Sequence, residues 1–234
     1  GGGMLRNVLS DLKLALRAAR REPGFAFIVV ATLTLGIGAN TAMFAFIHAA
    51  LLKPLPYKDP DRLVLARRTI EGRSLMWNSA PDYYDYKAEA DNLESLAASM
   101  PRAVRIGIRA GGRPERADLM VVSTDLFSTL GVSPLSGRTF APADGTSDAP
   151  QVALVGVGFA RRRFGSPEAA LGQSLSQAGG GSDSLTATIV GVMPAGCRFL
   201  DDADVWLPMR RGENDGPTTR QFHNWVLVGR LRPG

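Results

Sequence analysis

The feature that most constrains the fold is an uncharged run of 28 residues, at positions 25–52, which contains no Lys, Arg, Asp or Glu. About 20 consecutive apolar residues suffice for a helix to cross the hydrocarbon core of a bilayer. At ~1.5 Å per residue, a helix over this run would be about 42 Å long. The run therefore predicts a transmembrane helix, which we assign to residues 25–53.

Two other interpretations, a cleaved signal peptide and a buried core helix, fit the run less well. A cleaved signal peptide has a shorter apolar region, of about 7 to 15 residues, and ends in a small-residue cleavage site. Here Ala49-Ala50-Leu51-Leu52 matches such a site poorly and is followed by Lys53-Pro54. A buried core helix seldom runs beyond about 20 residues without a charge. A retained membrane span is thus the expected structure.

The distribution of charge argues against a nucleic-acid partner. The first 24 residues carry a net charge of +3, while the remaining 22 Lys/Arg and 20 Asp/Glu leave only +2 for the rest of the chain. A part this balanced shows no basic footprint for DNA or RNA. Basic residues before the span favour a cytoplasmic N-terminus, and long domains translocate largely regardless of their charge. We expect residues after about 54 to lie outside.

Residues 4–24 are expected to form an amphipathic helix that lies on the membrane surface. Leucine, valine and alanine recur at helical spacing, and a basic face that includes Arg17 and Arg20 suits the headgroups of membrane lipids. A surface helix packed on protein is the alternative. Pro23 and Gly24 after Arg21 predict an elbow before the span. Residues 1–3, Gly-Gly-Gly before Met4, resemble a cloning remnant and are not assigned to any predicted element.

Within the span, small residues predict a face that another helix approaches closely. Gly36, Gly38 and Ala42 are small, and Asn40 is a polar group at membrane depth. We interpret Asn40 as a helix-packing group, and we interpret His48 in the same way, near the outer interface. The Gly36-Ile37-Gly38 triplet lacks the preceding strand and third glycine of a dinucleotide site.

The remaining chain, residues 54–234, predicts an α+β domain outside the membrane. Short strand-like runs and short helices follow one another without the regular alternation of a doubly wound sheet. Strands are expected at 63–67, 103–109, 116–122, 151–155, 185–192, 204–207 and 224–231, and helices at 80–90, 124–130 and 158–164. A flexible loop is expected at 177–184.

A search for catalytic groups finds little. His48 and His223 are the only histidines, and the chain has no P-loop, no G-x-S-x-G motif and no paired-cysteine motif. We therefore expect no catalytic, cofactor or metal residue, and any ATP and Mg²⁺ to be bound by a different chain.

Three smaller groups of residues each have a plain interpretation. The acidic cluster Asp201-Asp202-Asp204 lacks EF-hand spacing and is typical of a solvated turn. Cys197 is interpreted as a small core residue rather than a nucleophile. The run at 161–163, three arginines, is interpreted as a solvated face rather than an anion site.

The block REPGFAFIVVATLTLGIGANTAMFAFIHAALLKPLPYKDPDRLV, at 21–64, resembles the N-terminal signature of MacB/FtsX-like ABC transporter permeases, in particular a duplicated branch common in acidobacteria. The resemblance continues in order through the blocks SAPDYYDYKAEADNLESLAA, PERADLMVVSTDLFSTLGVSPLSGRTFAPAD, ARRRFGSPEAALGQSL, IVGVMPAGCRFLDDADVWLP and NWVLVGRLRPG. It covers nearly the whole chain from Met4. Cys197 and the GGGSDS segment depart from the usual pattern without weakening it.

This resemblance implies a permease subunit of the bacterial inner membrane that is not itself an enzyme. In such proteins a separate cytoplasmic ATPase binds ATP and Mg²⁺, and the permease couples hydrolysis to export or mechanotransmission. Its implied partners are that ATPase, membrane lipids, a periplasmic adaptor or other protein, and a second permease half in a dimer or pseudo-dimer.

The resemblance also implies a division of the outer domain. A porter-like part would cover about 54–136 and 208–234, and an inserted β-rich part, called sabre, about 137–207. Because such permeases continue into further spans, the chain is expected to be a truncated piece. The alternative function is a single-pass anchored periplasmic binding or sensing module without an ATPase, and an envelope hydrolase is disfavoured because no nucleophile and base are paired.

Overall fold

The computed structural model describes residues 20–47, 57–70, 73–75, 77–178, 186–197, 199–212 and 220–233. The chain divides into two compact units, Gly1–Leu55 and Pro56–Gly234, which are described separately. An apolar helix in the first unit and a mixed α/β second unit confirm the expected fold class. Arg17, His48 and most of the helix expected at 4–24 lie outside the described residues.

The first unit contains helix α2 (Pro23–Ile47), which corresponds to the expected span. The Glu22 carbonyl accepts the first helical bond from Ala26 N at 3.1 Å, and Pro23 follows as the first helical residue, where its missing N–H costs nothing. Large apolar side chains are exposed all around the helix, with Leu35 76% exposed. Its part Pro23–Ala45 is long and apolar enough to cross a membrane.

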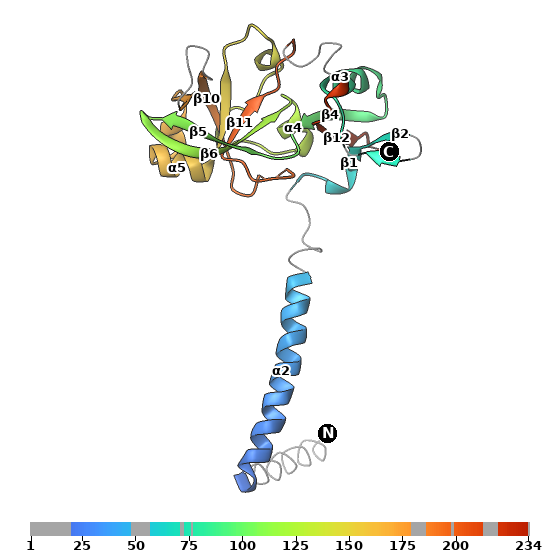
Figure 1. The fold of residues 1–234 in the computed structure, drawn as a ribbon, viewed down its shortest axis with the longest axis vertical. Coiled ribbons are helices and arrows are strands. Elements are labelled where there is room, and N and C mark those ends of the chain that lie inside the picture. The colour runs from blue at the N-terminus through green and yellow to red at the C-terminus, as the bar shows by residue number, and fades with distance from the viewer. Residues whose placement is uncertain are drawn as a thin grey trace, which may run out of the picture. The chain divides into compact units, whose positions relative to one another are not determined.

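The second unit, hereafter the outer domain, consists of short strands with four α-helices among its described residues (Figure 1). Its strands are β1 (Leu63–Ala66), β2 (Arg68–Ile70), β3 (Arg73–Leu75), β4 (Leu93–Ser99), β5 (Val104–Ala110), β6 (Arg113–Val122), β7 (Ser136–Gly137), β8 (Val152–Gly156), β9 (Ser174–Gln177), β10 (Thr186–Met193), β11 (Val205–Pro208) and β12 (Val226–Leu231). Its helices are α3 (Ala80–Glu89), α4 (Leu126–Leu130), α5 (Val157–Phe164) and α6 (Pro167–Ala170), with 3₁₀ turns η2 (Pro60–Arg62) and η3 (Pro142–Gly145).

Six of the strands close into a barrel. The pairing runs β6–β11–β8–β10–β9–β5, and β5 pairs back with β6 over its whole length, which completes the ring. The β11–β6 and β10–β8 pairs are parallel, and the other pairs in the ring are antiparallel. Closure leaves the barrel strands without a free edge along these pairings.

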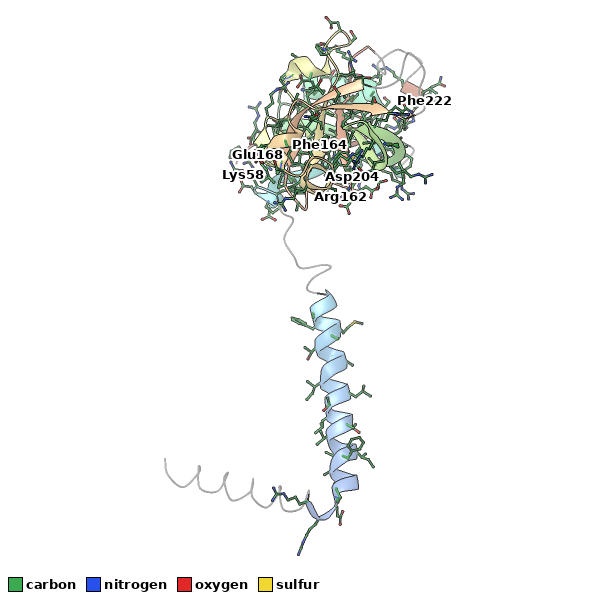
Figure 2. The ribbon with its side chains drawn as sticks, turned by 90° about the vertical axis from the view of Figure 1, so that its left-hand side faces the viewer. Lys58, Arg162, Phe164, Glu168, Asp204 and Phe222 are labelled. Atoms are coloured by element: carbon green, nitrogen blue, oxygen red, sulfur yellow. The ribbon has the colours of Figure 1, made fainter. Side chains whose placement is uncertain are left out.

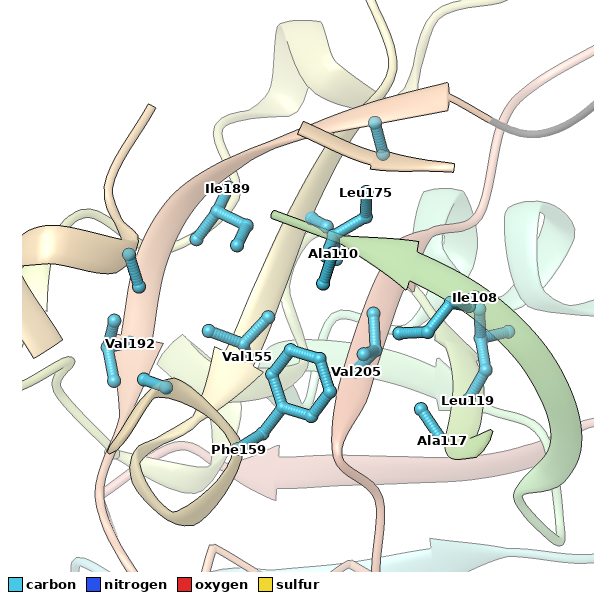
Figure 3. Packing of buried hydrophobic residues seen from close by; sticks show 14 of the residues in the cluster. Ile108, Ala110, Ala117, Leu119, Val155, Phe159, Leu175, Ile189, Val192 and Val205 are labelled. Atoms are coloured by element: carbon cyan, nitrogen blue, oxygen red, sulfur yellow. The ribbon is translucent and has the colours of Figure 1, made fainter. Parts of the chain in front are cut away.

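Buried side chains fill the barrel (Figure 3). They come from alternate positions of the strands, as the two-residue period of a strand requires, and many are small: Ile108, Ala110, Ala117, Leu119, Ala153, Val155, Leu175, Ala187, Ile189, Val205 and Leu207. Phe159 of α5, 1% exposed, belongs to the same core. The barrel interior is thus packed with side chains.

The sheet continues beyond the barrel as β4, β12 and β1. Strand β4 meets the end of β6 at the pair Ser99↔Val122, β12 lies beside β4, and β1 lies beside β12. Helix α3 and helix α4 contact this extension. Phe127 of α4 packs edge-on against Trp206 with ring centroids 5.7 Å apart, so α4 joins the extension to the barrel.

Most elements expected from the sequence are confirmed. Helix α3 starts with the capping box of Ser79 and Asp82, and α4 ends at Gly131, whose φ of 71° suits glycine. Strands β2, β3, β4, β7 and β9 and helix α6 were not expected. The division into porter-like and sabre-like parts stays a prediction, and strand pairing crosses its limits, because β5 and β6 pair with β9 and β11.

Candidate functional site at the two ends of the outer domain

The first and last strands of the outer domain lie side by side. Strand β1 pairs with β12 in antiparallel register, with Leu63 opposite Arg230 and Ala66 opposite Leu227. The start of the first strand is therefore next to the end of the last one. We take this junction as the candidate functional site because it brings segments far apart in the sequence into contact.

The Arg230 side chain forms hydrogen bonds that connect three segments at the junction. Its side chain is only 5% exposed, on the same side of β12 as Val228. Its Nε donates to the Thr129 carbonyl at 2.9 Å, Nη2 to the Lys58 carbonyl at 2.6 Å and Nη1 to the Asp59 carbonyl at 3.3 Å. One buried guanidinium thereby joins the last strand, the segment before β1 and the end of α4.

Arg62 makes the reciprocal connection from the start of the domain to its end. Its Nε donates to the carbonyl of Leu231 at 2.9 Å, and Nη2 donates to the same carbonyl and to the Glu94 carboxylate. Asp59 lies 3.8 Å from Nη1. Hydrogen bonds from a charged donor are about twice as strong as neutral ones. Together, Arg62 and Arg230 form what we call the arginine clasp.

The segment before the clasp is also anchored. The N–H of Lys58 donates to the carbonyl of Leu130 at 3.3 Å, and Tyr57 packs against the hydrophobic cluster around Phe127. Burial, together with the nearby Cys197, raises the pKa of Tyr57 to about 12, so its hydroxyl stays neutral. A Cβ on Gly131 would lie 2.5 Å from the Cβ of Lys58, so only glycine allows this approach.

A cavity of about 390 Å³ opens at the clasp. Charged side chains that line it are Lys58, Asp59, Arg62, Glu94 and Arg230. Its remaining wall includes hydroxyl and apolar groups from α4 and the segments that follow it: Phe127, Ser128, Gly131, Val132, Ser133, Pro134 and Thr139. We call this cavity the junction cavity.

The residues expected at the elbow and in the span lie elsewhere, in the first unit. Arg20 and Arg21 are exposed helical residues, and Pro23 and Gly24 begin α2. The predicted packing face consists of Gly36, Gly38, Asn40 and Ala42, all of which are exposed on α2. Roles for these residues in lipid contact and helix packing stay predictions.

The other chemistry-bearing residues have structural roles. No group of three potential metal ligands occurs in the described part of the chain. Asp204 pairs with Arg162 at 3.0 Å, and Asp201 accepts from Ala103 N at 3.1 Å. His223 Nε2 lies 2.5 Å from Arg68 Nη1.

The solvated-face interpretation of residues 161–163 is wrong for Arg163. Its side chain is 14% exposed, and its guanidinium donates to the carbonyls of Ala110 and Arg113 at the barrel rim, at 2.6–2.9 Å. The physical reason is that the last turn of α5 packs on the hairpin between β5 and β6, whose turn carbonyls need donors.

Cys197, expected as a small core residue, is half-buried and lies at the edge of the hydrophobic core. It packs against the cluster around Trp206, and burial raises the pKa of its thiol to about 12. The thiolate is the reactive form of a cysteine. We therefore expect maleimide at pH 8 to label Cys197 at least about 100-fold more slowly than an exposed cysteine. The exposed reference is position 148, introduced as Asp148→Cys in a Cys197→Ala background. Comparable labelling rates, measured by mass spectrometry, would contradict a thiol whose pKa is raised.

Sequence reasoning missed the clasp. Neither Arg62 nor Arg230 was predicted to be a site residue, and Arg230 lies within the strand expected at 224–231. One signal was present: Arg230 is the only charged residue in 225–231, WVLVGRL, and a lone charge in an apolar strand indicates a buried partner. Its partners are backbone carbonyls, which no sequence motif marks.

An apolar helix long enough to cross a membrane, followed by a separate mixed α/β domain, defines the class of protein to which the chain belongs. The family model described as MacB-like periplasmic core domain matches residues 26–234, and the chain belongs to this family. It is thus a MacB-like permease component, and its apolar helix indicates the inner membrane.

Solved structures support the fold. A domain of a permease protein from Porphyromonas gingivalis aligns with a TM-score of 0.60 at 19% identity, over 76% of this chain and 78% of that one. The periplasmic region of MacB from Actinobacillus actinomycetemcomitans aligns with a TM-score of 0.50 at 13% identity, over 72% and 73%. A comparison with curated protein sequences gave no match.

Proposed function

We propose that this chain is part of the permease subunit of an ABC transporter, in which a separate cytoplasmic ATPase drives export or mechanotransmission across the inner membrane. The N-terminus would be cytoplasmic, α2 would cross the membrane and the outer domain would be periplasmic. The chain itself binds no cofactor in this proposal, because ATP and Mg²⁺ belong to the ATPase. It acts without catalysing a reaction.

The observation that supports this function best is the arginine clasp. A domain that only binds a ligand needs one attachment to its anchor, whereas a domain that receives movement benefits when its first and last strands form one rigid unit. The antiparallel pair of β1 and β12, fastened by Arg62 and Arg230, provides such a unit. Cores and packed interfaces of this kind transmit displacement because they deform little.

The proposed function implies several partners. The ATPase would contact the cytoplasmic segment around Arg20 and Arg21, while Pro23 and Gly24 turn the chain from the lipid surface into the span. Gly36, Gly38, Asn40 and Ala42 would face another helix, from a further span or from the second half of a permease dimer or pseudo-dimer. A periplasmic adaptor or protein substrate would contact the outer domain.

The proposal is tested by purifying the full-length gene product from native membranes in several mild detergents. We expect a second subunit to co-purify and to hydrolyse ATP, with activity lost when its own nucleotide-binding lysine is replaced. If no ATPase accompanies the protein in any of these detergents, the permease function is contradicted and the single-pass binding or sensing module takes its place.

A further inference from the structure

We propose that an exposed basic surface of the barrel binds an extended acidic segment of a protein partner. The surface is the outer side of β5 and β6 around Arg105, Arg109 and Arg116, which we call the arginine face. The inference deepens the proposed function and rests on it in one respect, that the outer domain contacts another protein. It adds the surface that is used and the chemistry of the partner.

The alternation of side chains along β5 and β6 points these arginines away from the barrel core. Successive side chains of a strand lie on opposite faces of the sheet. One set fills the core (Figure 3): Ile108, Ala110, Ala117 and Leu119. Arg105, Arg109 and Arg116 occupy the alternate positions and are exposed. They therefore lie on the outer side of the barrel.

The register between the two strands brings the three arginines together. Arg116 lies opposite Gly107, and Arg105 and Arg109 lie two residues to either side of this glycine. Diagonal neighbours across a strand pair are about 7–8 Å apart, which is within reach of long side chains. Because Gly107 has no side chain, no group of β5 separates Arg116 from the other two arginines.

Gly107 is a second observation that points to a ligand. Its backbone does not have the positive φ that favours glycine. Among the described residues, a Cβ at this position would meet only the Cβ of Ala178, at 3.4 Å, so the fold leaves room for alanine. Glycine weakens a strand interior and often marks a place where a ligand or another backbone approaches closely.

One arginine of the face already binds a carboxylate. Arg105 Nε and Nη2 donate to Oδ1 and Oδ2 of Asp118, each at 2.8 Å. A further carboxylate near Arg105, that of Asp204, is paired with Arg162 at 3.0 Å (Figure 2). The bidentate pair shows that a carboxylate fits the outer side of this sheet.

Arg109 and Arg116 form no ion pair within the described part of the chain. Three arginines against the single carboxylate of Asp118 leave a net charge of +2 on the face. Like charges that lie close together on a sheet are destabilising, so this arrangement is unfavourable until a ligand neutralises it. The geometry therefore favours an anion that reaches two guanidinium groups.

The neighbouring strands continue the face with hydroxyl groups. Ser176 of β9 lies opposite Arg109, and Thr186 of β10 lies opposite Ser176. Strand β5 has β6 on one side and β9 on the other, so a partner cannot add a strand here and must lie across the face. Arginine binds carboxylates bidentately, and hydroxyl groups donate to them as well.

The spacing of the arginines selects an extended acidic segment. In an extended peptide, alternate side chains lie on one face, roughly 6.6–6.8 Å apart. This repeat is close to the separation of about 7–8 Å expected for diagonal neighbours such as Arg109 and Arg116. Two carboxylates at alternate positions can therefore each take up the geometry that Asp118 has with Arg105.

The test is fluorescence anisotropy on the full chain in a nonionic maltoside detergent, at an ionic strength of about 0.15 M, where long-range attraction is screened. The probe is a short peptide in which glutamate alternates with serine and which carries a neutral fluorophore. Its control has glutamine in place of glutamate. The main variant is Arg109→Gln/Arg116→Gln. The matched variant, Arg67→Gln/Arg232→Gln, removes two exposed charges that follow β1 and β12 in the sheet extension.

We expect the glutamate peptide to bind the wild-type chain and the Arg67→Gln/Arg232→Gln chain with affinities within about twofold. It should bind the Arg109→Gln/Arg116→Gln chain at least about fivefold more weakly, because two ion pairs are lost. The glutamine peptide should bind none of the three chains measurably.

Equal weakening by the two variants would show that binding follows net charge and would overturn the arginine face. Equal affinity for the glutamate and glutamine peptides would overturn an acidic partner. Tighter binding of dextran sulfate to the same face would replace the protein partner with an anionic polysaccharide. Co-purification of the ATPase with the Arg109→Gln/Arg116→Gln chain, measured in parallel, separates these results from a failure of the proposed function.

Discussion

Replacing Arg230 with methionine is expected to lower the free energy of unfolding of the outer domain by about 3–5 kcal/mol, because three carbonyls each lose a hydrogen bond from a charged donor, worth roughly 1–2 kcal/mol apiece. Methionine fills a similar volume but donates no hydrogen bond. The carbonyls of Thr129, Lys58 and Asp59 would each lose a donor, and the ends of the domain would separate. Urea unfolding of the full chain in mild detergent measures this change.

Tryptophan fluorescence reports on the outer domain alone in this experiment, because all three tryptophans, at 77, 206 and 225, belong to it. The matched control is Arg232→Met, two residues further along the chain. Arg232 is exposed, and its side chain donates to the Leu93 carbonyl at 3.2 Å, so we expect a loss below about 1 kcal/mol. Equal effects of both substitutions would show that the clasp contributes little.

The second large effect is expected from Phe159→Ala, with a loss of about 3–5 kcal/mol. Phe159 is 1% exposed and contributes its ring to the barrel core, with Phe164 edge-on at a centroid distance of 6.4 Å. The strands around it are held by their own hydrogen bonds and cannot collapse into the space that the ring leaves. The same unfolding measurement detects the loss.

Phe222→Ala serves as the control for this substitution, because Phe222 is 67% exposed. Its removal is expected to change stability by less than about 0.5 kcal/mol. A small effect at Phe159 would mean that the barrel core does not depend on α5, and would contradict the packing seen in Figure 3.

Local sequence patterns predicted much of the fold. The uncharged run predicted the apolar helix, and the helices expected at 80–90 and 124–130 are α3, which starts after Ser79, and α4, which ends at Gly131. Each of these signals depends on a few neighbouring residues: a charge-free stretch, a capping box, or a glycine able to adopt positive φ. The ordered sequence blocks predicted the family, which the match over residues 26–234 confirms.

Features that depend on distant residues were not predictable in this way. Strand β4 begins as the polar segment Leu93-Glu94-Ser95, which resembles a loop, and becomes a strand because β12 and β6 flank it. Barrel closure depends on the pairing of β5 with β9, whose residues are more than 60 positions apart. The candidate site escaped notice because its arginines bind carbonyls, and every residue supplies a carbonyl.

The proposed permease function requires the outer domain to move when a partner ATPase hydrolyses ATP. Its most direct test is pulsed EPR on the complex, with spin labels at Thr34→Cys in α2 and Asp148→Cys in the outer domain, in a Cys197→Ala background. We expect the distance distribution between the two labels to differ between the nucleotide-free state and the state trapped with ADP and vanadate. An identical distribution in both states, in a complex that still hydrolyses ATP, would contradict the account.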